Sequence, residues 1–231
     1  MIKIKQPLVE NILLVGQSKT PVIVIDDFGD SLHGLRVVAQ DYARFTPAQG
    51  GYPGCRAVLP SSYGSAVLSV LQPLIQSVYS LPDTAQGRCY QQFFSLVTKR
   101  PSELSTLQRL PHFDSDVSRY FAVMHYLGDG DFGGTGFFRH KASGVERVKP
   151  DNRSVFIESV RGELKQSEPA HEYIAGSNDR FEMTASVEYR VNRLMVYPGN
   201  LLHSGLINTA TDINHCPLTG RLTANIFVDF S

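Results

Sequence analysis

The region from Cys89 onward is a succession of short strand-like segments separated by turn residues, and this pattern is the strongest constraint on the fold. The candidate strands are residues 90–97, 119–127 (RYFAVMHYL), 187–197 and 221–230 (RLTANIFVDF), with a shorter one beginning at Phe137. Glycine and proline mark the turns between them, as in GDGDFGG after residue 127. Because helices do not alternate regularly with these strands, a β-sandwich or jelly roll is expected in place of a parallel βαβ array.

Residues 1–88 are predicted to be rich in helix. PVIVID at 21–26 is expected to form one buried strand, followed by a helix from residue 30 or 31 to about 44. The Gly- and Pro-rich stretch 46–62 predicts a loop, and apolar residues at helical spacing between 67 and 78 predict a second helix, bent by Pro73.

We therefore expect one domain over residues 1–231, mainly β with flanking helices. Its double-stranded β-helix core, jelly-roll or cupin-like, would span residues 89–231, with an insertion at about 139–187 that is helical near 152–165. The N-terminal helices would buttress this core.

Charge and cysteine content narrow the functional classes. The 22 basic and 22 acidic residues give a formal net charge of zero, so nothing predicts binding to nucleic acid or to a membrane surface. No apolar run approaches the ~20 residues of a membrane span. The 3 cysteines are widely spaced and predict free thiols, not a disulfide framework. We expect a cytoplasmic protein; its oligomeric state is not indicated.

His112-Phe113-Asp114 is the first motif that suggests chemistry. Residues two apart in an extended segment point the same way, so an imidazole and a carboxylate would project side by side. One distant histidine would complete a two-histidine, one-carboxylate face that holds Fe(II) and leaves positions for a chelating cosubstrate and O₂. The triplet alone is weak evidence, since it also fits a surface loop with a His–Asp hydrogen bond.

The candidate third ligand is His203, in YPGNLLHSG just after a strand end. A partly exposed, hydrogen-bonding histidine is the ordinary alternative for this position.

The last predicted strand has one polar and one apolar face. Arg221, Thr223 and Asn225 share the polar face, which lies either in solvent or along a cavity. In a cavity, the planar fork of Arg221 would match a ligand carboxylate, and Thr223 would add a hydroxyl donor.

In this order, the parts resemble the Fe(II)/2-oxoglutarate-dependent oxygenases, most closely their prolyl-4-hydroxylase-like branch. PHFD followed by RYFAVMHYLGDGDFGGTGFF is similar to that branch's metal motif, core strand and Gly-Gly turn, and PVIVIDDF is similar to its entry segment. The resemblance implies Fe(II) held by His112, Asp114 and His203. It also implies 2-oxoglutarate as cosubstrate, its distal carboxylate bound by Arg221 with help from Tyr126 and Thr223.

Two intervals are longer here than in the prolyl-4-hydroxylase-like branch: the one from Asp114 to His203 and the one from His203 to Arg221. The first interval fits the insertion at 139–187. The second interval makes Arg193 a competitor of Arg221 for the carboxylate. His140 is a minor candidate for the pocket, and His125 is expected to face away from the side on which Tyr126 lies.

Residues 52–56 (YPGCR) are expected to be a loop with a buried tyrosine and an exposed arginine; the alternative is that they border the substrate entrance.

The activity implied by the resemblance is hydroxylation of a C–H bond, coupled to conversion of 2-oxoglutarate to succinate and CO₂. No catalytic residue beyond the metal ligands is predicted. The substrate is not indicated: a peptide or protein side chain, an amino acid and a small metabolite all fit, and desaturation or demethylation also stays open. Two alternatives are a cupin-like metal enzyme that does not use 2-oxoglutarate and a non-catalytic jelly-roll binding module.

Overall fold

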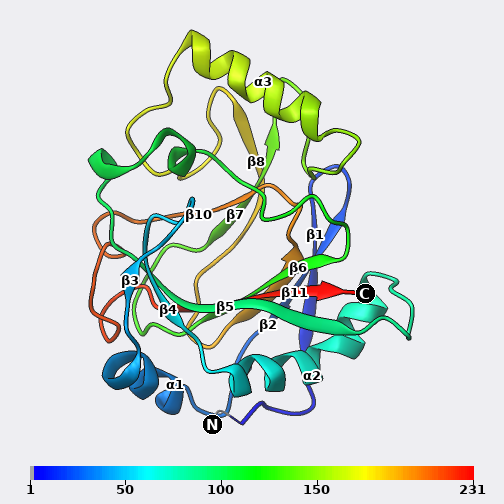
Figure 1. Cartoon of the computed structure of the whole chain (residues 1–231), viewed down its shortest axis with the longest axis vertical. Coiled ribbons are helices and arrows are strands. Elements are labelled where there is room, and N and C mark those ends of the chain that lie inside the picture. Colours follow the sequence, from blue (N-terminus) through cyan, green and yellow to red (C-terminus); the bar gives the residue numbers. More distant parts are fainter. Residues whose placement is uncertain (1–2) are drawn as a thin grey trace.

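The computed structural model describes residues 3–231, and its larger sheet is an antiparallel sheet of eight strands (Figure 1). The strands lie in the order β1-β2-β9-β6-β11-β5-β4-β3, so the C-terminal strand is near the middle. Their bounds are β1 (Glu10–Val15), β2 (Thr20–Ile25), β3 (Thr46–Pro47), β4 (Gly54–Val58), β5 (Gly87–Val97), β6 (Tyr120–Tyr126), β9 (Leu194–Pro198) and β11 (Thr223–Phe230).

A smaller sheet contains β10 (His203–Gly205), β7 (Thr135–His140) and β8 (Phe181–Val187), in that order. His112 makes an isolated antiparallel bridge to His203 and so extends this sheet. From β5 onward successive strands alternate between the sheets, except that β7 and β8 both lie in the small one: β5, β6, β9 and β11 belong to the large sheet, and the His112 segment, β7, β8 and β10 to the small sheet. This is the arrangement of a double-stranded β-helix, so the predicted jelly-roll fold is confirmed.

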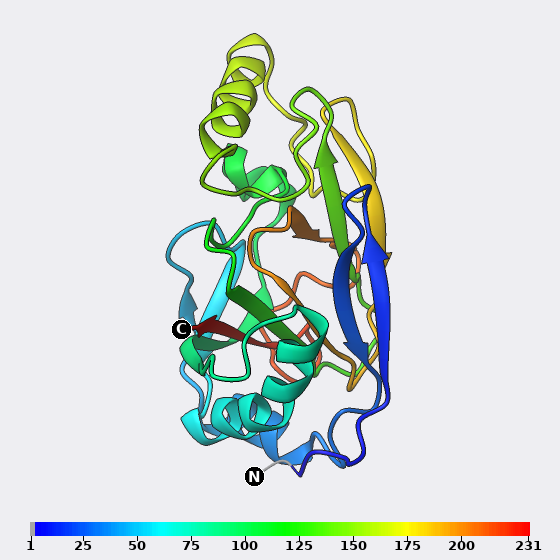
Figure 2. The same cartoon turned by 90° about the vertical axis from the view of Figure 1, so that its right-hand side faces the viewer.

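The helices lie at two ends of the molecule. α1 (His33–Val37), which continues into a π-helical turn (Val38–Tyr42), and α2 (Ser61–Val78) are at one end, and α3 (Arg153–Gln166) is at the other in both views (Figures 1 and 2). Two short 3₁₀ helices (Pro101–Glu103 and Thr106–Arg109) follow β5. Within residues 3–231, no helix combines the length and hydropathy needed to cross a membrane.

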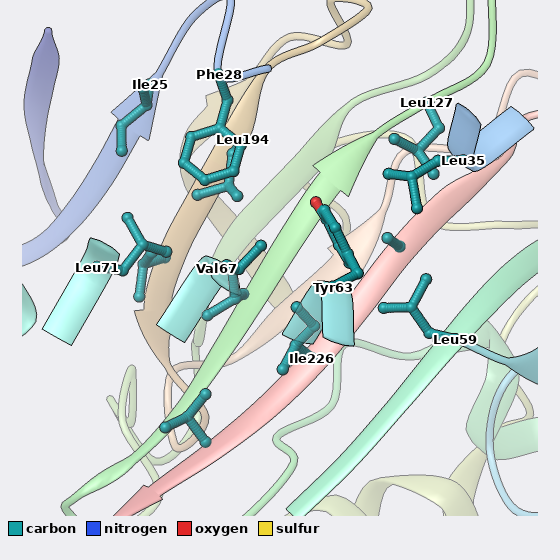
Figure 3. Close-up of a cluster of buried hydrophobic side chains, with 14 of the residues drawn as sticks. Ile25, Phe28, Leu35, Leu59, Tyr63, Val67, Leu71, Leu127, Leu194 and Ile226 are labelled. Carbon is teal, nitrogen blue, oxygen red and sulfur yellow. The ribbon is translucent and has the colours of Figure 1, made fainter. Parts of the chain in front are cut away.

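Alternation along the central strands separates a helix-packed face of the large sheet from the opposite face. Ile226 of β11 and Leu194 of β9 join Tyr63, Val67 and Leu71 of α2 in one buried cluster (Figure 3). Fully burying such a side chain contributes about 1.5–3 kcal/mol, so this cluster anchors the helices to the sheet. Residues of opposite parity on the same strands point to the other side, where the candidate site lies.

The expectation of an α-rich N-terminal third requires correction. Residues 1–88 contain both predicted helices, but they also contribute β1, β2, β3 and β4 to the large sheet. The predicted loop 46–62 includes β3 and β4, because β4 pairs with the edge of β5 and β3 pairs with β4, so strands form where local composition favours a turn. The predicted strand 21–26 corresponds to β2.

The expected insertion at 139–187 is shorter than predicted. Its last part is β8, which pairs with β7 along the small sheet and is therefore a core strand. The helix predicted at 152–165 is present as α3.

Candidate metal centre and cavity

The structure brings His112, Asp114 and His203 together. Reciprocal backbone hydrogen bonds of 2.9 Å between His112 and His203 hold the two segments side by side, and the Asp114 amide donates to the Gly199 carbonyl at 2.7 Å. The three possible ligand atoms lie within 4.8 Å of one another. His112 Nε2 is 3.8 Å from Asp114 Oδ1, and His203 Nε2 is 3.7 Å from Asp114 Oδ2. Side chains far apart in the sequence thus form one possible three-ligand face.

The hydrogen bonds of this cluster prepare it for a cation. His203 Nδ1 donates to the Leu201 carbonyl at 2.8 Å, which leaves the lone pair of Nε2 on the side of Asp114. Asp114 Oδ2 is buried and has no hydrogen-bond partner among the described residues. A buried carboxylate oxygen without a donor is costly, and a metal ion bound between the three side chains would remove that cost.

The cavity environment shifts all three pKa values: the shifts of the two histidines favour a metal site, whereas that of Asp114 opposes one but leaves the carboxylate mostly ionised at pH 7. Burial lowers the pKa of His203 to about 4. Desolvation by the surrounding cavity walls, followed by the nearby His203, lowers the pKa of His112 to about 4 as well, although the ring faces the cavity and is 56% exposed, so both imidazoles are neutral at pH 7. Burial raises the pKa of Asp114 to about 6, although His112 and Arg56 oppose this effect. Two neutral imidazoles and one carboxylate are the donors that Fe(II) takes in two-histidine, one-carboxylate sites.

The cluster lies in the wall of a cavity of about 650 Å³. The His112 side chain is 56% exposed, whereas that of His203 is only 6% exposed. One wall is the polar face of β11, with Thr223 and Asn225, and another is apolar, from α3 and the segment before β6. This volume is typical of sites for small organic molecules.

Arg221 also lines this cavity and is held firmly. Its Nε donates to the Gly133 carbonyl at 2.7 Å, and Nη2 donates to the Gly134 carbonyl at 3.1 Å. Asp212, fully buried, lies 3.5 Å away and neutralises the charge. The rings of Tyr126 and Tyr189 lie 5.6 and 5.7 Å from the guanidinium carbon. Nη1 makes no hydrogen bond to any described residue.

Thr223 and Tyr126 are neighbours in the sheet, but they differ in their relation to the cavity. They are directly paired across β11 and β6, and Thr223 lines the cavity. The Tyr126 hydroxyl is 2.8 Å from Thr135 Oγ1, and Tyr126 is not among the residues of the cavity wall. Tyr126 therefore contacts Arg221 from outside the cavity. Its hydroxyl is hydrogen-bonded to Thr135, which does line the cavity.

The other candidates lie outside the cavity. Arg193 forms a bidentate ion pair with Asp26, so it is not placed to compete for a ligand. His125 faces the helices, as expected, and its Nδ1 is 2.7 Å from the Tyr63 hydroxyl. The fully buried His140 contacts Ser143 and Glu163.

Residues 52–56 are expected from the sequence to be a loop with a buried tyrosine and an exposed arginine; the Tyr52 hydroxyl is buried, but the expectation for the arginine is wrong. Arg56 is half-buried on β4, and both Tyr52 and Arg56 line the cavity. The period-two pattern of a strand was the signal that could have shown this orientation, but the flanking glycines and prolines obscured it. Sequence analysis also missed Tyr120 and the apolar residues of α3 that complete the cavity.

Comparison with known proteins places the chain in a sequence family. Residues 7–228 match the model of a family of unknown function, DUF6445. The chain belongs to this family. No curated protein matches it.

Several solved structures match the chain. They include the non-heme α-ketoglutarate-dependent epimerase SnoN from nogalamycin biosynthesis, at 14% identity and a TM-score of 0.47, covering 90% of this chain and 78% of that one. HygX from Streptomyces hygroscopicus, with nickel and 2-oxoglutarate bound, has 13% identity and a TM-score of 0.48, covering 91% and 83%. HygX with nickel, 2-oxoglutarate and hygromycin B has 14% identity and a TM-score of 0.46, covering 91% and 82%. At this distance, function must be argued from the chain's own residues.

Proposed function

We propose that this protein is an Fe(II)- and 2-oxoglutarate-dependent oxygenase that oxidises a C–H bond of an organic substrate. The observation that carries the proposal is the convergence of His112, Asp114 and His203 around an unpartnered buried carboxylate oxygen in a cavity wall. When bound there, iron and 2-oxoglutarate would together activate O₂, the oxidant: one oxygen atom would enter succinate as 2-oxoglutarate loses CO₂, and the other would be available to oxidise the substrate.

The protein's own residues would divide the remaining work. The Leu201 carbonyl keeps the proton of His203 on Nδ1, away from the metal position. Arg221 would bind the distal carboxylate of 2-oxoglutarate through Nη1, while its other nitrogens and the ring of Tyr126 hold it in place. Thr223 would add a hydroxyl from the next position on the same strand face. The apolar wall that includes Phe156 and Val160 of α3 would exclude water from the reacting carbon.

The proposal concerns the superfamily of Fe(II)/2-oxoglutarate-dependent oxygenases as a whole and not one of its branches. Assignment to the prolyl-4-hydroxylase-like branch remains a prediction, because Thr135 takes up the Tyr126 hydroxyl that would contact the cosubstrate in that branch. Hydroxylation as the outcome and cytoplasmic location likewise remain predictions.

One observation favours a second candidate, a metal enzyme that does not use 2-oxoglutarate. Asp212 already neutralises Arg221, and two backbone carbonyls occupy two of its nitrogens. Such an arginine needs no ligand carboxylate to be stable in the folded protein.

Anaerobic titration distinguishes the candidates. We expect a weak visible charge-transfer band that requires both Fe(II) and 2-oxoglutarate. Metal binding without this band would favour the second candidate, and absence of metal binding would favour a non-catalytic binding module.

Variants then assign the residues. His203→Ala should abolish iron binding, with the exposed His215→Ala as its matched control. Arg221→Gln should retain iron but require much more 2-oxoglutarate, with the exposed Arg88→Gln as control. An unchanged 2-oxoglutarate requirement in Arg221→Gln would remove Arg221 from the site.

A further inference from the structure

Arg56 is a second arginine in the cavity, and it enters from a different strand from Arg221. On β4 it pairs with Ser95 of β5, which in turn pairs with Thr223 of β11. Residues paired in this way point to the same face, and adjacent strands are about 4.8 Å apart, so the Arg56 backbone lies roughly 10 Å from that of Thr223. The two arginines are therefore attached at separate places along one wall.

The guanidinium of Arg56 lies against two aromatic rings but has no anionic partner. Its central carbon is 4.5 Å from the centre of the Tyr52 ring and 5.0 Å from that of Phe93. Within residues 3–231, no carboxylate lies within 4.0 Å of it, and its buried Nε has no hydrogen-bond partner. This differs from Arg221, which Asp212 neutralises.

A second polar atom beside Arg56 is also unpartnered. The Tyr52 hydroxyl is buried and, although Ser95 is nearby, completes no hydrogen bond. Burial lowers the pKa of Arg56, and the charge of Asp114 opposes this effect from the metal side of the cavity. A metal ion on Asp114 would take up that negative charge and leave Arg56 without compensation.

Another wall of the cavity is apolar. Leu110, Phe156, Ile157, Val160 and Leu164 line it, mostly from α3. The exposed Arg161 also lies on that side. A cavity of about 650 Å³ is larger than one small dicarboxylic acid would fill, so there is room for a second molecule.

We propose that Arg56, assisted by the Tyr52 hydroxyl, binds an anionic group of the substrate, and that the substrate is an organic acid with an apolar portion packed against α3. This rests on the proposed function, because it assumes that Arg221 and the metal site are reserved for 2-oxoglutarate and iron. Arg56 would supply two donors of a planar fork to a carboxylate, and contact with the rings of Tyr52 and Phe93 would help to hold that fork in place.

The test uses octanoate as probe and octanamide as its uncharged counterpart. Each is titrated calorimetrically into the full chain in saturating Ni(II) and 2-oxoglutarate, so that octanoate cannot occupy the cosubstrate site. We expect octanoate to bind at least about tenfold more tightly than octanamide, since a hydrogen bond to a charged group is involved. Arg56→Gln should remove that preference, and Arg161→Gln should keep it.

Arg56→Lys, which preserves the charge, tests the planar fork without removing the cation. It should retain part of the preference, and circular dichroism of both Arg56 variants should match the parent protein. Equal binding of octanoate and octanamide to the parent protein, or loss of the preference in Arg161→Gln instead of Arg56→Gln, would overturn the proposal.

The Fe(II)/2-oxoglutarate charge-transfer band separates this proposal from the proposed function. Arg56→Gln should keep the band, and its loss would mean that Arg56 holds the cosubstrate, which also overturns the assignment. If the parent protein shows no band, the titrations are repeated without metal or 2-oxoglutarate. An Arg56-dependent octanoate preference would then sustain the anion site while the oxygenase proposal fails.

Discussion

The buried pair between Arg221 and Asp212 allows a quantitative test of how the cavity is built. Both side chains are almost inaccessible, 4% and 0% exposed, and their closest charged atoms are 3.5 Å apart. At an effective dielectric constant of about 20, unit charges at this distance attract by about 5 kcal/mol. Asp212→Asn removes the negative charge but keeps a side chain of nearly the same shape, so it isolates the electrostatic contribution.

The expected loss is smaller than the Coulomb energy alone. Arg221 keeps its hydrogen bonds to the carbonyls of Gly133 and Gly134, which stabilise part of its charge. Gly133 and Asn208 both donate backbone hydrogen bonds to Asp212 Oδ2, so an amide oxygen at that position can still accept them, and only the Thr211 hydroxyl loses its acceptor at Oδ1. We therefore expect Asp212→Asn to lower the free energy of unfolding by about 3 kcal/mol, as is usual when one partner of a buried pair is removed.

Urea denaturation without metal or cosubstrate measures this loss. The matched control is Asp129→Asn, which removes an ion pair with Arg36 at a similar distance, 3.7 Å, but with the carboxylate 75% exposed. Solvent screens that pair, so the control should change stability by less than about 1 kcal/mol. Equal small losses in both variants would show that Asp212 is not needed to neutralise Arg221, and the account of the cavity given above would be wrong.

Three further changes test the surrounding framework. Glu146 accepts hydrogen bonds from the amides of Gln17 and Ser18; burial alone would raise its pKa, but these bonds outweigh it and hold the pKa below 4.5. Its contribution is thus present above pH 4.5 and lost as the pH falls through the lower folded-state pKa, so urea curves of the parent protein and Glu146→Gln should differ at pH 7 and converge in acid. Tyr63→Phe should cost about 1–3 kcal/mol in the same assay at pH 7, because it leaves the buried Nδ1 of His125 without a donor, and an unchanged midpoint would contradict this hydrogen bond. Gly54→Ala would place a Cβ 2.0 Å from a backbone oxygen of β5, so we expect at least about 1–3 kcal/mol of destabilisation, and a melting temperature equal to that of the parent would refute the close approach.

The sequence by itself determined the features that depend on local periodicity. The alternation in 119–127 and 221–230 correctly placed His125 opposite Tyr126 and put Thr223 and Asn225 on one face, because side-chain direction in a strand depends only on parity. Likewise, the two-residue spacing of His112 and Asp114 predicted that their side chains point to the same side. Composition and turn residues were sufficient for a jelly roll, since short strands without alternating helices have few other ways to bury their apolar faces.

Only the tertiary structure decided which distant residues meet. His203 reaches Asp114 because its segment pairs with that of His112, and no local pattern records such a pairing. The same holds for Arg56: its strand exists because β5 offers hydrogen-bonding groups at its edge, whereas the glycines and prolines around it favour a loop. Strand propensity is a weak local preference that cross-strand contacts override. The existence of β4 and the residues that contact the two arginines therefore depend on how the strands pair, which the local sequence does not specify.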